Sequence, residues 1–141
     1  MANIHIDIVS AEGHIHSGEA RMVFAPAEMG EVGIAPRHAP LLTRLKPGTV
    51  RVQPPEGEEL EFFVGGGILE IQPYLVTVLA DTALRAKDAD EAAALAAKQA
   101  AEEKLAGAQT DIDLARAQAE MIEAAARLQF VQKLKSSKRG S

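Results

Sequence analysis

The residues that interrupt helices are confined to the first part of this chain, which limits what each part can fold into. All seven prolines and nine of the eleven glycines precede Leu84, whereas residues 86–108 contain eleven alanines and only Gly107 as a helix breaker. Proline and glycine disfavour helix interiors, and alanine has the highest helix propensity. We therefore predict two domains, residues 1–85 built from strands and turns and residues 86–141 built from helices.

The first domain shows the alternation of apolar and polar residues that is typical of strands with one buried face. Ile4, Ile6 and Ile8 fall on one face of such a strand. Residues that favour turns recur between the apolar runs, and we expect turns at Pro47-Gly48 and at glycines 65–67. Several Val-, Ile- and Phe-rich strands of this kind predict an N-terminal β-sandwich of two antiparallel sheets with a shared core.

The second domain is predicted to form a C-terminal antiparallel two-helix hairpin. Asp88, with Glu91 three residues later, fits a helix N-cap and its reciprocal partner, and Gly107 ends the first helix. Thr110 begins a second helix with acids in its first turn and bases in its last, as the helix dipole favours. Its apolar residues form a narrow seam that repeats every seven positions: Leu114, Ala117, Met121, Ala124, Leu128 and Val131. Alanine buries little area, so we expect a marginally held hairpin.

Charge and cysteine content narrow the functional classes. Residues 1–83 carry 11 acids and 5 bases, a net charge of −6, whereas residues 84–141 carry 9 acids and 10 bases, a net charge of +1. The bases accumulate in a short tail after Glu123, but the chain has only five aromatic residues for base stacking, so we expect no nucleic-acid partner. The absence of cysteine excludes disulfides, thiolate metal sites and cysteine nucleophiles.

Neither secretion nor membrane insertion is expected. A signal peptide begins with a basic segment followed by a continuous apolar run, whereas the first residues here alternate apolar and polar side chains. No stretch reaches the roughly 18 apolar residues of a membrane-spanning helix. We therefore expect a protein that stays out of the secretory route and has no direct insertion into lipid.

The residues that could carry chemistry do not form a recognisable active site. His14 and His16 would share one face of a strand, a spacing that metal sites use, but a zinc site needs at least a third protein ligand. Glycines 65–67 follow a strand but precede no helix, which argues against a phosphate-binding loop. We expect no catalytic residue and no metal. The alternatives are a metal-dependent enzyme that uses the two histidines, or a ligand-binding β-sandwich whose helices dimerise.

Two stretches resemble the epsilon subunit of bacterial F-type ATP synthases. The first is GEVGIAPRHAPLLTRLKPG at residues 30–48, and the second is VGGGILEI at residues 64–71 followed by VTVLADTA at residues 76–83. The resemblance covers essentially the whole chain and includes the order of β-sandwich and helical hairpin. It implies a non-catalytic central-stalk subunit of the proton-translocating enzyme, peripheral to the cytoplasmic face of the bacterial inner membrane.

The resemblance also implies partners and site residues. The β-sandwich would bind the gamma subunit and the membrane rotor ring of c subunits, with Glu31 and His38 in a loop that faces the ring. The helical arm would restrain ATP hydrolysis in the alpha/beta catalytic head. The implied hinges of the arm are Ala86, Lys87 and Gly107. The implied basic face of the arm consists of Arg116, Arg127, Lys133 and Lys135, whereas we interpret Lys138 and Arg139 as a tail without such a role.

Some members of this family bind ATP in the folded hairpin through an I/L-D-x-x-R-A motif on the first helix. Here IDLARA at residues 112–117 fits that motif but lies on the second helix. At the first-helix position Asp90 is retained and Ala93 replaces the arginine. Of two second-helix arginines associated with the site, Arg127 is retained and Glu123 replaces the other. Losing a guanidinium and gaining a carboxylate disfavours a triphosphate, so we expect weak or absent ATP binding and no other cofactor.

Overall fold

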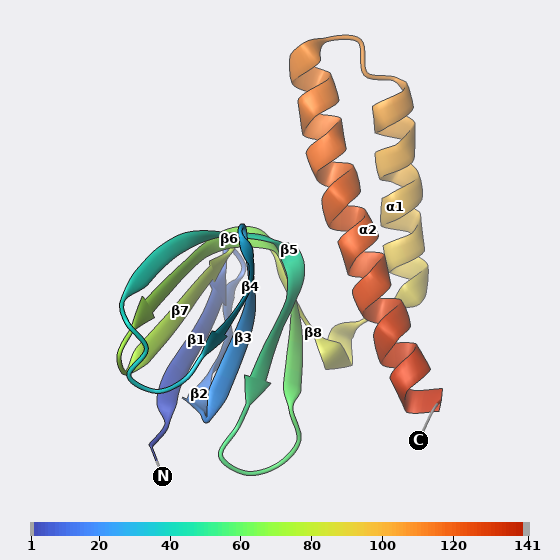
Figure 1. The fold of residues 1–141 in the computed structure, drawn as a ribbon. Helices are drawn as coiled ribbons and strands as arrows, with labels where there is room; N and C mark the ends of the chain where they lie inside the picture. Colours follow the sequence, from blue (N-terminus) through green and yellow to red (C-terminus); the bar gives the residue numbers. More distant parts are fainter. Residues whose placement is uncertain (1, 140–141) are drawn as a thin grey trace. The chain divides into compact units, whose positions relative to one another are not determined.

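The computed structural model describes the backbone of residues 2–139 and the side chains of residues 2–136. The chain divides into two compact units, Met1–Lys87 and Asp88–Ser141. The boundary predicted from composition, after residue 85, lies two residues before this division. The strands belong to the first unit and the two long helices to the second (Figure 1).

The first unit is one sheet that folds over itself. Its eight strands pair in the order β2-β1-β7-β6-β5-β3-β4, and β8 pairs with β6. Neighbouring strands are antiparallel except β1 and β7, which are parallel. The bounds are β1 (Ile4–Ser10), β2 (Gly13–Ala20), β3 (Met22–Ala27), β4 (Gly30–Ile34), β5 (Leu41–Gln53), β6 (Leu60–Gln72), β7 (Leu75–Ala80) and β8 (Ala83–Arg85). The predicted β-sandwich is thus confirmed, and the structure adds that its two layers belong to one continuous sheet with a single parallel pair, β1 and β7.

The two layers are continuous because β5 and β6 are long enough to belong to both. The end of β5 and the start of β6 pair with β3 and β8, whereas the other half of β6 pairs with β7. The turns expected at Pro47-Gly48 and at glycines 65–67 are therefore wrong, since both stretches lie inside strands. The glycines serve another purpose: Gly66 and Gly67 have φ angles of 101° and 135°, and a Cβ on Gly67 would overlap the carbonyl oxygen of Leu79.

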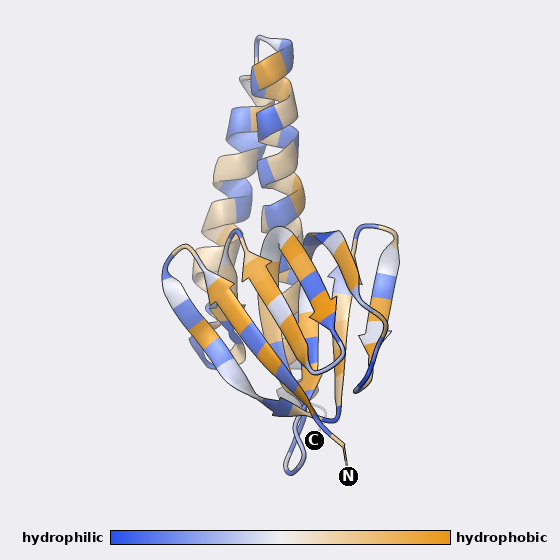
Figure 2. Cartoon of the chain, turned by 90° about the vertical axis from the view of Figure 1, so that its left-hand side faces the viewer, coloured by the Kyte–Doolittle hydropathy of each residue, from blue (hydrophilic) through white to orange (hydrophobic). Residues whose placement is uncertain are grey.

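The core of the first unit consists of branched aliphatic side chains. Ile4, Ile6 and Ile8 of β1 are fully buried, as their alternation predicts, and they belong to one cluster with apolar residues of the other long strands. Figure 2 shows the apolar residues concentrated along the strands. Burying a side chain of this size stabilises the fold by about 1.5–3 kcal/mol. A closely packed core of this kind makes the unit a firm support for surface groups.

The second unit is the predicted antiparallel hairpin. A short 3-10 turn, η1 (Ala86–Asp88), is followed by α1 (Glu91–Ala106) and α2 (Asp111–Arg139). The N-cap of α1 is Asp90, whose carboxylate accepts hydrogen bonds from the backbone N–H groups of residues 92 and 93 at 3.0 and 3.3 Å. The expected cap, Asp88, ends the 3-10 turn instead, because that turn delays the start of the helix. Gly107 and Thr110 do cap the two helices as predicted.

Small side chains form the contact between the helices. The buried residues include Ala94 and Ala101 of α1 and Ala117 and Ala124 of α2. Leu114 was expected in this seam but is 40% exposed. Leu114 lies in the first turn of α2, beside the loop that joins the two helices. Within residues 2–139, neither helix has a stretch long and apolar enough to cross a membrane.

Candidate functional site

Glu31 lies in β4 and not in a loop, which corrects the expectation for this residue. The Nη2 group of Arg51, on β5, donates to Glu31 Oε1 at 3.2 Å, and Nη1 donates to Glu59 Oε1 at 3.2 Å. The guanidinium carbon of Arg51 lies 4.3 Å from the centroid of the Phe24 ring, a cation–π distance. Strand β3 lies between β4 and β5 and places Phe24 directly opposite Arg51. Glu31 is therefore ion-paired while its side chain stays 54% exposed.

His38 lies in the segment that joins β4 to β5. Its Nδ1–H group donates to the carbonyl of Ala39 at 2.7 Å, and its backbone N–H donates to Ala35 at 3.2 Å. The preceding residue, Arg37, has a φ of 67°, which a side chain with a Cβ rarely adopts, and its N–H donates to the carbonyl of Pro73. The bond from Arg37 holds the segment against the β6–β7 turn, and the two bonds of His38 fix the conformation of the segment itself. No contact within the described residues joins His38 to Glu31.

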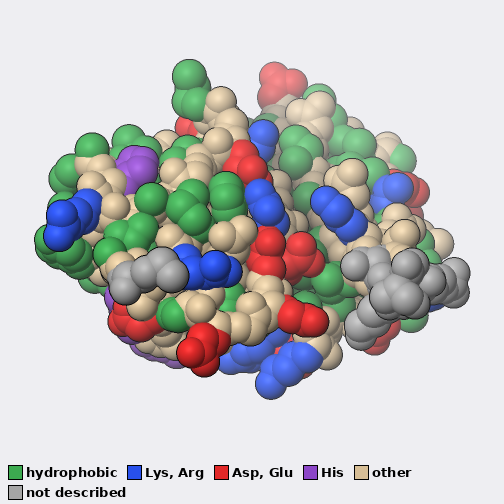
Figure 3. All heavy atoms as spheres, turned by 60° about the horizontal axis from the view of Figure 1, so that its bottom comes forward, with side chains coloured by type: hydrophobic (Ala, Val, Ile, Leu, Met, Phe, Trp, Pro, Cys, Tyr) green, Lys and Arg blue, Asp and Glu red, His purple; other side chains and the backbone are tan. Residues whose placement is uncertain are grey.

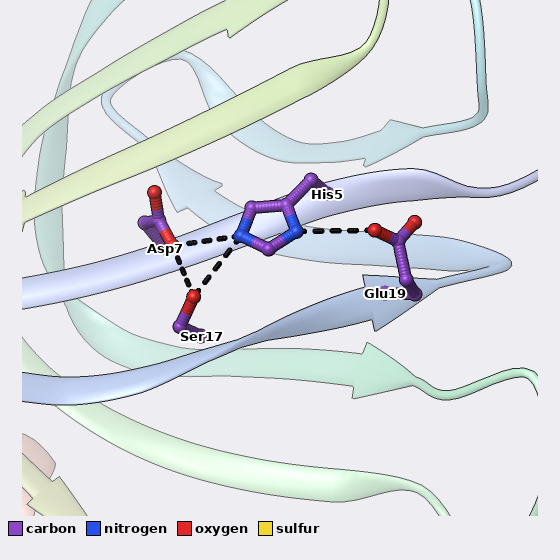
Figure 4. A network of polar contacts seen from close by, with 4 residues as sticks. All are labelled: His5, Asp7, Ser17 and Glu19. Carbon is purple, nitrogen blue, oxygen red and sulfur yellow. Dashed lines mark hydrogen bonds and ion pairs between the residues drawn. The ribbon is translucent and has the colours of Figure 1, made fainter.

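A polar network that sequence reasoning missed lies on the surface of β1 and β2 (Figure 4). His5 Nδ1 lies 3.2 Å from Glu19 Oε1, and Nε2 lies 3.0 Å from both Asp7 Oδ1 and Ser17 Oγ. Ser17 also donates to Asp7 at 2.6 Å. His5 faces Glu19 and Asp7 faces Ser17 across the two strands. A signal existed in the alternating polar positions on either side of the turn at Ala11 and Glu12, which joins β1 to β2, but the register was needed to pair them.

This network is suited to stabilising a strand pair and not to nucleophilic catalysis. In a serine–histidine–aspartate triad the hydroxyl and the carboxylate bind opposite ring nitrogens. Here the Glu19 carboxylate lies at the opposite nitrogen from Ser17, but the Ser17 hydroxyl donates its proton to Asp7 at 2.6 Å and not to His5. The hydrogen bond to Glu19 and that to Asp7 raise the pKa of His5, while partial burial opposes them. The hydrogen bond from Ser17 is the main cause that lowers the pKa of Asp7, and His5 adds to it.

His14 and His16 are not brought into a metal site. The register between β1 and β2 shifts at this point, so that Ile8 faces His16 and Val9 faces His14. The ring of His16 lies 5.0 Å from that of Phe62, and burial lowers the pKa of this histidine. Among residues 2–136, no three His, Asp or Glu side chains gather as metal ligands would. The alternative of a metal-dependent enzyme has no support in that part of the chain.

The four basic residues assigned to the arm do not share one face of α2. At about 100° per residue, Arg116 and Arg127 lie about 20° apart around the helix. Lys133 lies about 120° to one side of Arg127, and Lys135 lies about 80° to the other. Lys135 is also paired with Glu91 of α1 at 3.3 Å. The side chains of Lys138 and Arg139 lie outside the described residues.

The IDLARA stretch lines a pocket at the end of the hairpin where α1 turns into α2. The pocket has a volume of about 450 Å³ and is lined by Lys104, Gly107, Ala108, Asp113, Arg116, Ala117 and Glu120. Lys104 is paired with Glu120 at 3.1 Å. Two bases and two acids line the pocket, so its charges offset one another. Such a lining does not select for a polyanion such as a triphosphate.

The two residues assigned to a weak nucleotide site have different environments. The carboxylate of Asp90 caps α1, which explains its presence without any ligand. Arg127 is half-buried on α2, and its buried Nε has no hydrogen-bond partner within the described residues. No described contact joins Asp90 to Arg127.

The residues assigned as hinges lie at the ends of helical segments. Ala86 and Lys87 belong to η1, at the division between the two units. Gly107 caps α1 with a φ of −92°, and a Cβ there would lie 3.5 Å from the carbonyl oxygen of Glu103, an ordinary contact. The backbone conformation of Gly107 therefore does not require glycine in the folded hairpin.

Apolar side chains are exposed on the outer face of β5, β6 and β7. Leu42 is 68% exposed, Ile68 38% and Leu79 51%. Ile68 is the register partner of both Arg44 and Leu79, and Leu42 lies two residues before Arg44, so all three apolar side chains point to one side. The face of the molecule in Figure 3 shows hydrophobic side chains interspersed with acidic and basic ones. An exposed apolar group of this kind is typical of a protein-binding surface.

Both parts of the chain match models of one protein family. Residues 3–86 match the beta-sandwich domain of the ATP synthase delta/epsilon chain, and residues 82–132 match its long alpha-helix domain. The chain is 64% identical over 132 residues to the ATP synthase epsilon chain of Nitrosococcus oceani, with 94% of each chain covered. It is 59% identical over 135 residues to the epsilon chain of Alkalilimnicola ehrlichii, with 96% of each covered.

Solved structures share the fold at low sequence identity. A chain of the Euglena gracilis mitochondrial ATP synthase, solved as OSCP, F1 and c-ring, superposes with a TM-score of 0.75 at 16% identity, covering 89% of this chain and 79% of that chain. A chain of the Tetrahymena thermophila mitochondrial ATP synthase, solved as central stalk and c-ring, gives a TM-score of 0.62 at 12% identity, covering 94% and 97%.

Proposed function

The chain belongs to the family of ATP synthase delta/epsilon chains, and on that premise we propose that it couples the catalytic head to the membrane rotor and restrains ATP hydrolysis. It is a non-catalytic subunit of the ATP synthase complex. Its place is the central stalk of a proton-translocating enzyme, as a peripheral subunit at the cytoplasmic face of the bacterial inner membrane. The partners are the gamma subunit, the ring of c subunits and the alpha/beta head.

The first unit is the docking and coupling part. The apolar group formed by Leu42, Ile68 and Leu79 is the surface that we assign to the gamma subunit, because its burial against another protein removes apolar area from water. Glu31 and His38 are assigned to the rotor ring. A rotor contact has to transmit torque without deforming, and the closely packed aliphatic core beneath these residues meets that requirement.

The second unit is the regulatory arm. The single observation that carries this assignment is its alanine seam, which buries far less apolar area per turn than a seam of leucines. An element with two states of similar energy can be shifted by a partner, and a weakly packed hairpin has such states. Arg116 is already exposed in the folded hairpin, and when the hairpin opens, the half-buried Arg127 on the same side of α2 becomes available with it to acidic surfaces of the head.

ATP is not assigned as a ligand of this arm. Asp90 acts as a helix cap, Ala93 supplies no guanidinium, and Glu123 places a carboxylate where an arginine is associated with ATP binding. Isothermal titration calorimetry of the complete chain with ATP is expected to give no saturable heat at micromolar concentrations. A dissociation constant in the micromolar range would contradict this assignment.

The proposal is tested by steady-state ATP hydrolysis with a catalytic head that has been stripped of its own epsilon chain. The head is titrated with the full chain, with residues 1–87 and with a full-length double variant, Arg116→Gln with Arg127→Gln. Lys98→Gln on α1 is the matched control for loss of a base. Inhibition by the full chain and the control, with binding but no inhibition by residues 1–87, would support both roles.

The other outcomes separate the two roles. If the full chain and residues 1–87 both bind and neither inhibits, the arm is not a brake and the role contracts to coupling. If neither form binds the head with its gamma subunit, the central-stalk assignment itself fails. Undiminished inhibition by the double arginine variant would remove those two residues from the basic face.

A further inference from the structure

Arg51 occupies the centre of a cross-strand cluster on the outer surface of β3, β4 and β5. Its two Nη groups donate to Glu31 and to Glu59, each at 3.2 Å. Its guanidinium lies over the ring of Phe24, with 4.3 Å between the guanidinium carbon and the ring centroid. The side chain of Arg51 is 32% exposed, and its strand neighbours Val50 and Val52 are fully buried. Arg51 therefore stands on the core, whereas Glu59 belongs to the end of the loop that precedes β6.

We propose that Arg51 is a positioning residue for Glu31, which holds one carboxylate oxygen so that the other is presented to the partner. This inference rests on the docking role proposed above for Glu31. In the described contacts, Arg51 donates to Oε1 of Glu31. The other oxygen, Oε2, keeps its acceptor capacity, and the side chain is 54% exposed. The group on the partner that meets Glu31 is accordingly a cation or a hydrogen-bond donor.

The shape of arginine explains why this residue can do the positioning. A guanidinium is planar, its donors are fixed in a fork, and it stacks on an aromatic ring. Phe24 fixes the plane of the fork, and the two carboxylates fix its rotation within that plane. A lysine would keep the charge but lose both constraints. Phe24 thus orients the guanidinium of Arg51, and Arg51 in turn orients the carboxylate of Glu31.

Neighbouring acids make the role of Arg51 electrostatic as well as geometric. Glu61 is the register partner of Arg51 on β6, and Glu59 lies beside it. Without the guanidinium, the carboxylates of Glu31, Glu59 and Glu61 would repel one another. Residues 1–83 also carry a net charge of −6, so an approaching cation is attracted to this unit as a whole.

The experiment measures the affinity of the complete chain, bound to its gamma subunit, for detergent-solubilised rotor rings. Glu31→Gln is expected to weaken binding by about threefold, the scale of a partly exposed ion pair. Arg51→Gln is expected to weaken it by about the same factor. The double variant is expected to be no weaker than either single one, because Arg51 acts through Glu31. Arg51→Lys should fall between the wild type and Arg51→Gln.

Glu59→Gln is the matched control, since it removes the other carboxylate and leaves the Arg51–Glu31 pair intact. Its affinity should equal that of the wild type, and all the differences should shrink at about 1 M salt. Binding to the gamma subunit and the melting temperature report on folding of each variant. Arg51→Lys keeps the test valid if Arg51→Gln does not fold.

Two results would overturn this inference and leave the assignment of Glu31 to the rotor ring intact. The first is a double variant whose loss equals the product of the two single losses, since Arg51 would then act independently of Glu31. The second is a normal affinity for Arg51→Gln when Glu31→Gln is weakened. A normal affinity for Glu31→Gln would overturn the inference together with the assignment of Glu31 to the ring, while the hydrolysis experiment would still test the arm.

Discussion

The β unit and the helical unit bury different kinds of side chain. In the β unit the largest fully buried residues are isoleucine, valine and leucine, drawn from most of the long strands. In the helical unit the buried cluster contains Ala94, Leu128 and Val131, with alanine at most of the other covered positions. A buried isoleucine stabilises by about 1.5–3 kcal/mol, and alanine contributes far less.

This difference in packing makes the β unit rigid and the helical unit able to change its arrangement. Dense packing of branched side chains gives one well-defined state, because any displacement opens cavities or forces overlaps. A seam of small side chains loses less when it separates, so two arrangements of the helices can lie within a few kcal/mol of each other. The packing of each unit determines how firmly its surface residues are held. The Arg51 cluster lies over the rigid core, whereas Arg116 and Arg127 lie on the weakly packed hairpin.

The largest effect that tests this contrast is expected at Gly67 in the β unit. Gly67→Ala should lower the free energy of unfolding by roughly 3 kcal/mol or more, because the residue has a φ of 135° and its Cβ would overlap the carbonyl of Leu79. Urea denaturation measures the loss. Gly13→Ala is the control, with a φ of 127° and open space around an added Cβ, and should cost about 1 kcal/mol. Equal losses would show that φ alone decides.

An intermediate effect is expected when the seam of the helical unit is overfilled. Ala101 is 4% exposed between the helices, so Ala101→Leu should destabilise the hairpin by about 1–3 kcal/mol. Amide hydrogen exchange should accelerate in α1 and α2 and stay unchanged in β1 and β7. Ala100→Leu, at an exposed position one residue away, is the control and should leave exchange unchanged. Faster exchange in the β strands would show that the units do not unfold separately.

The smallest effect is expected in the pH dependence of the free energy of unfolding of the β unit. The hydrogen bonds to Glu19 and Asp7 raise the pKa of His5 in the folded state. His5 therefore stabilises the fold fully at pH values below its unfolded pKa of 6.5, and this stabilisation is lost as the pH rises through the raised pKa. Burial lowers the pKa of His16 in the folded state, so the stability linked to the neutral form of His16 is present at pH values above its unfolded pKa of 6.5 and is lost as the pH falls. The two histidines therefore oppose each other near neutral pH.

Removal of His5 should expose the contribution of His16. In His5→Gln, the free energy of unfolding should fall more steeply than in the wild type between about pH 7.5 and 5.5, by less than about 1 kcal/mol because the network is partly exposed. Urea denaturation at several pH values provides the measurement. His14→Gln, at an exposed position of β2, the strand that also carries His16, is the control. Identical pH profiles for the wild type and His5→Gln would contradict the assignment of the network.

Local signals predicted much of the fold. The alternation of Ile4, Ile6 and Ile8 indicated the buried face of β1, and Gly107 with Thr110 indicated where one helix ends and the next begins. Signals of this kind depend on neighbours along the chain. The N-cap of α1 was misplaced at Asp88 because the preceding 3-10 turn depends on how the chain leaves β8.

Nonlocal pairing explains what could not be predicted. Glycines 65–67 are typical of a turn, but the partners on both sides of β6 keep this stretch extended. The parallel pairing of β1 with β7 joins strands far apart in the chain, and no spacing in the sequence encodes it. The pairing of Arg51 with Glu31, and that of His5 with Glu19, required the register between strands.

The amino-acid sequence by itself determined the division into a strand-rich and a helical part, the apolar faces and the family resemblance, because composition, periodicity and motifs are properties of neighbouring residues. Only the tertiary structure decided that one sheet folds over itself, that His5 binds Glu19 and that Glu31 is held by Arg51. These features arise from backbone pairing and side-chain packing between distant segments, whose energies depend on the whole fold and not on any local stretch.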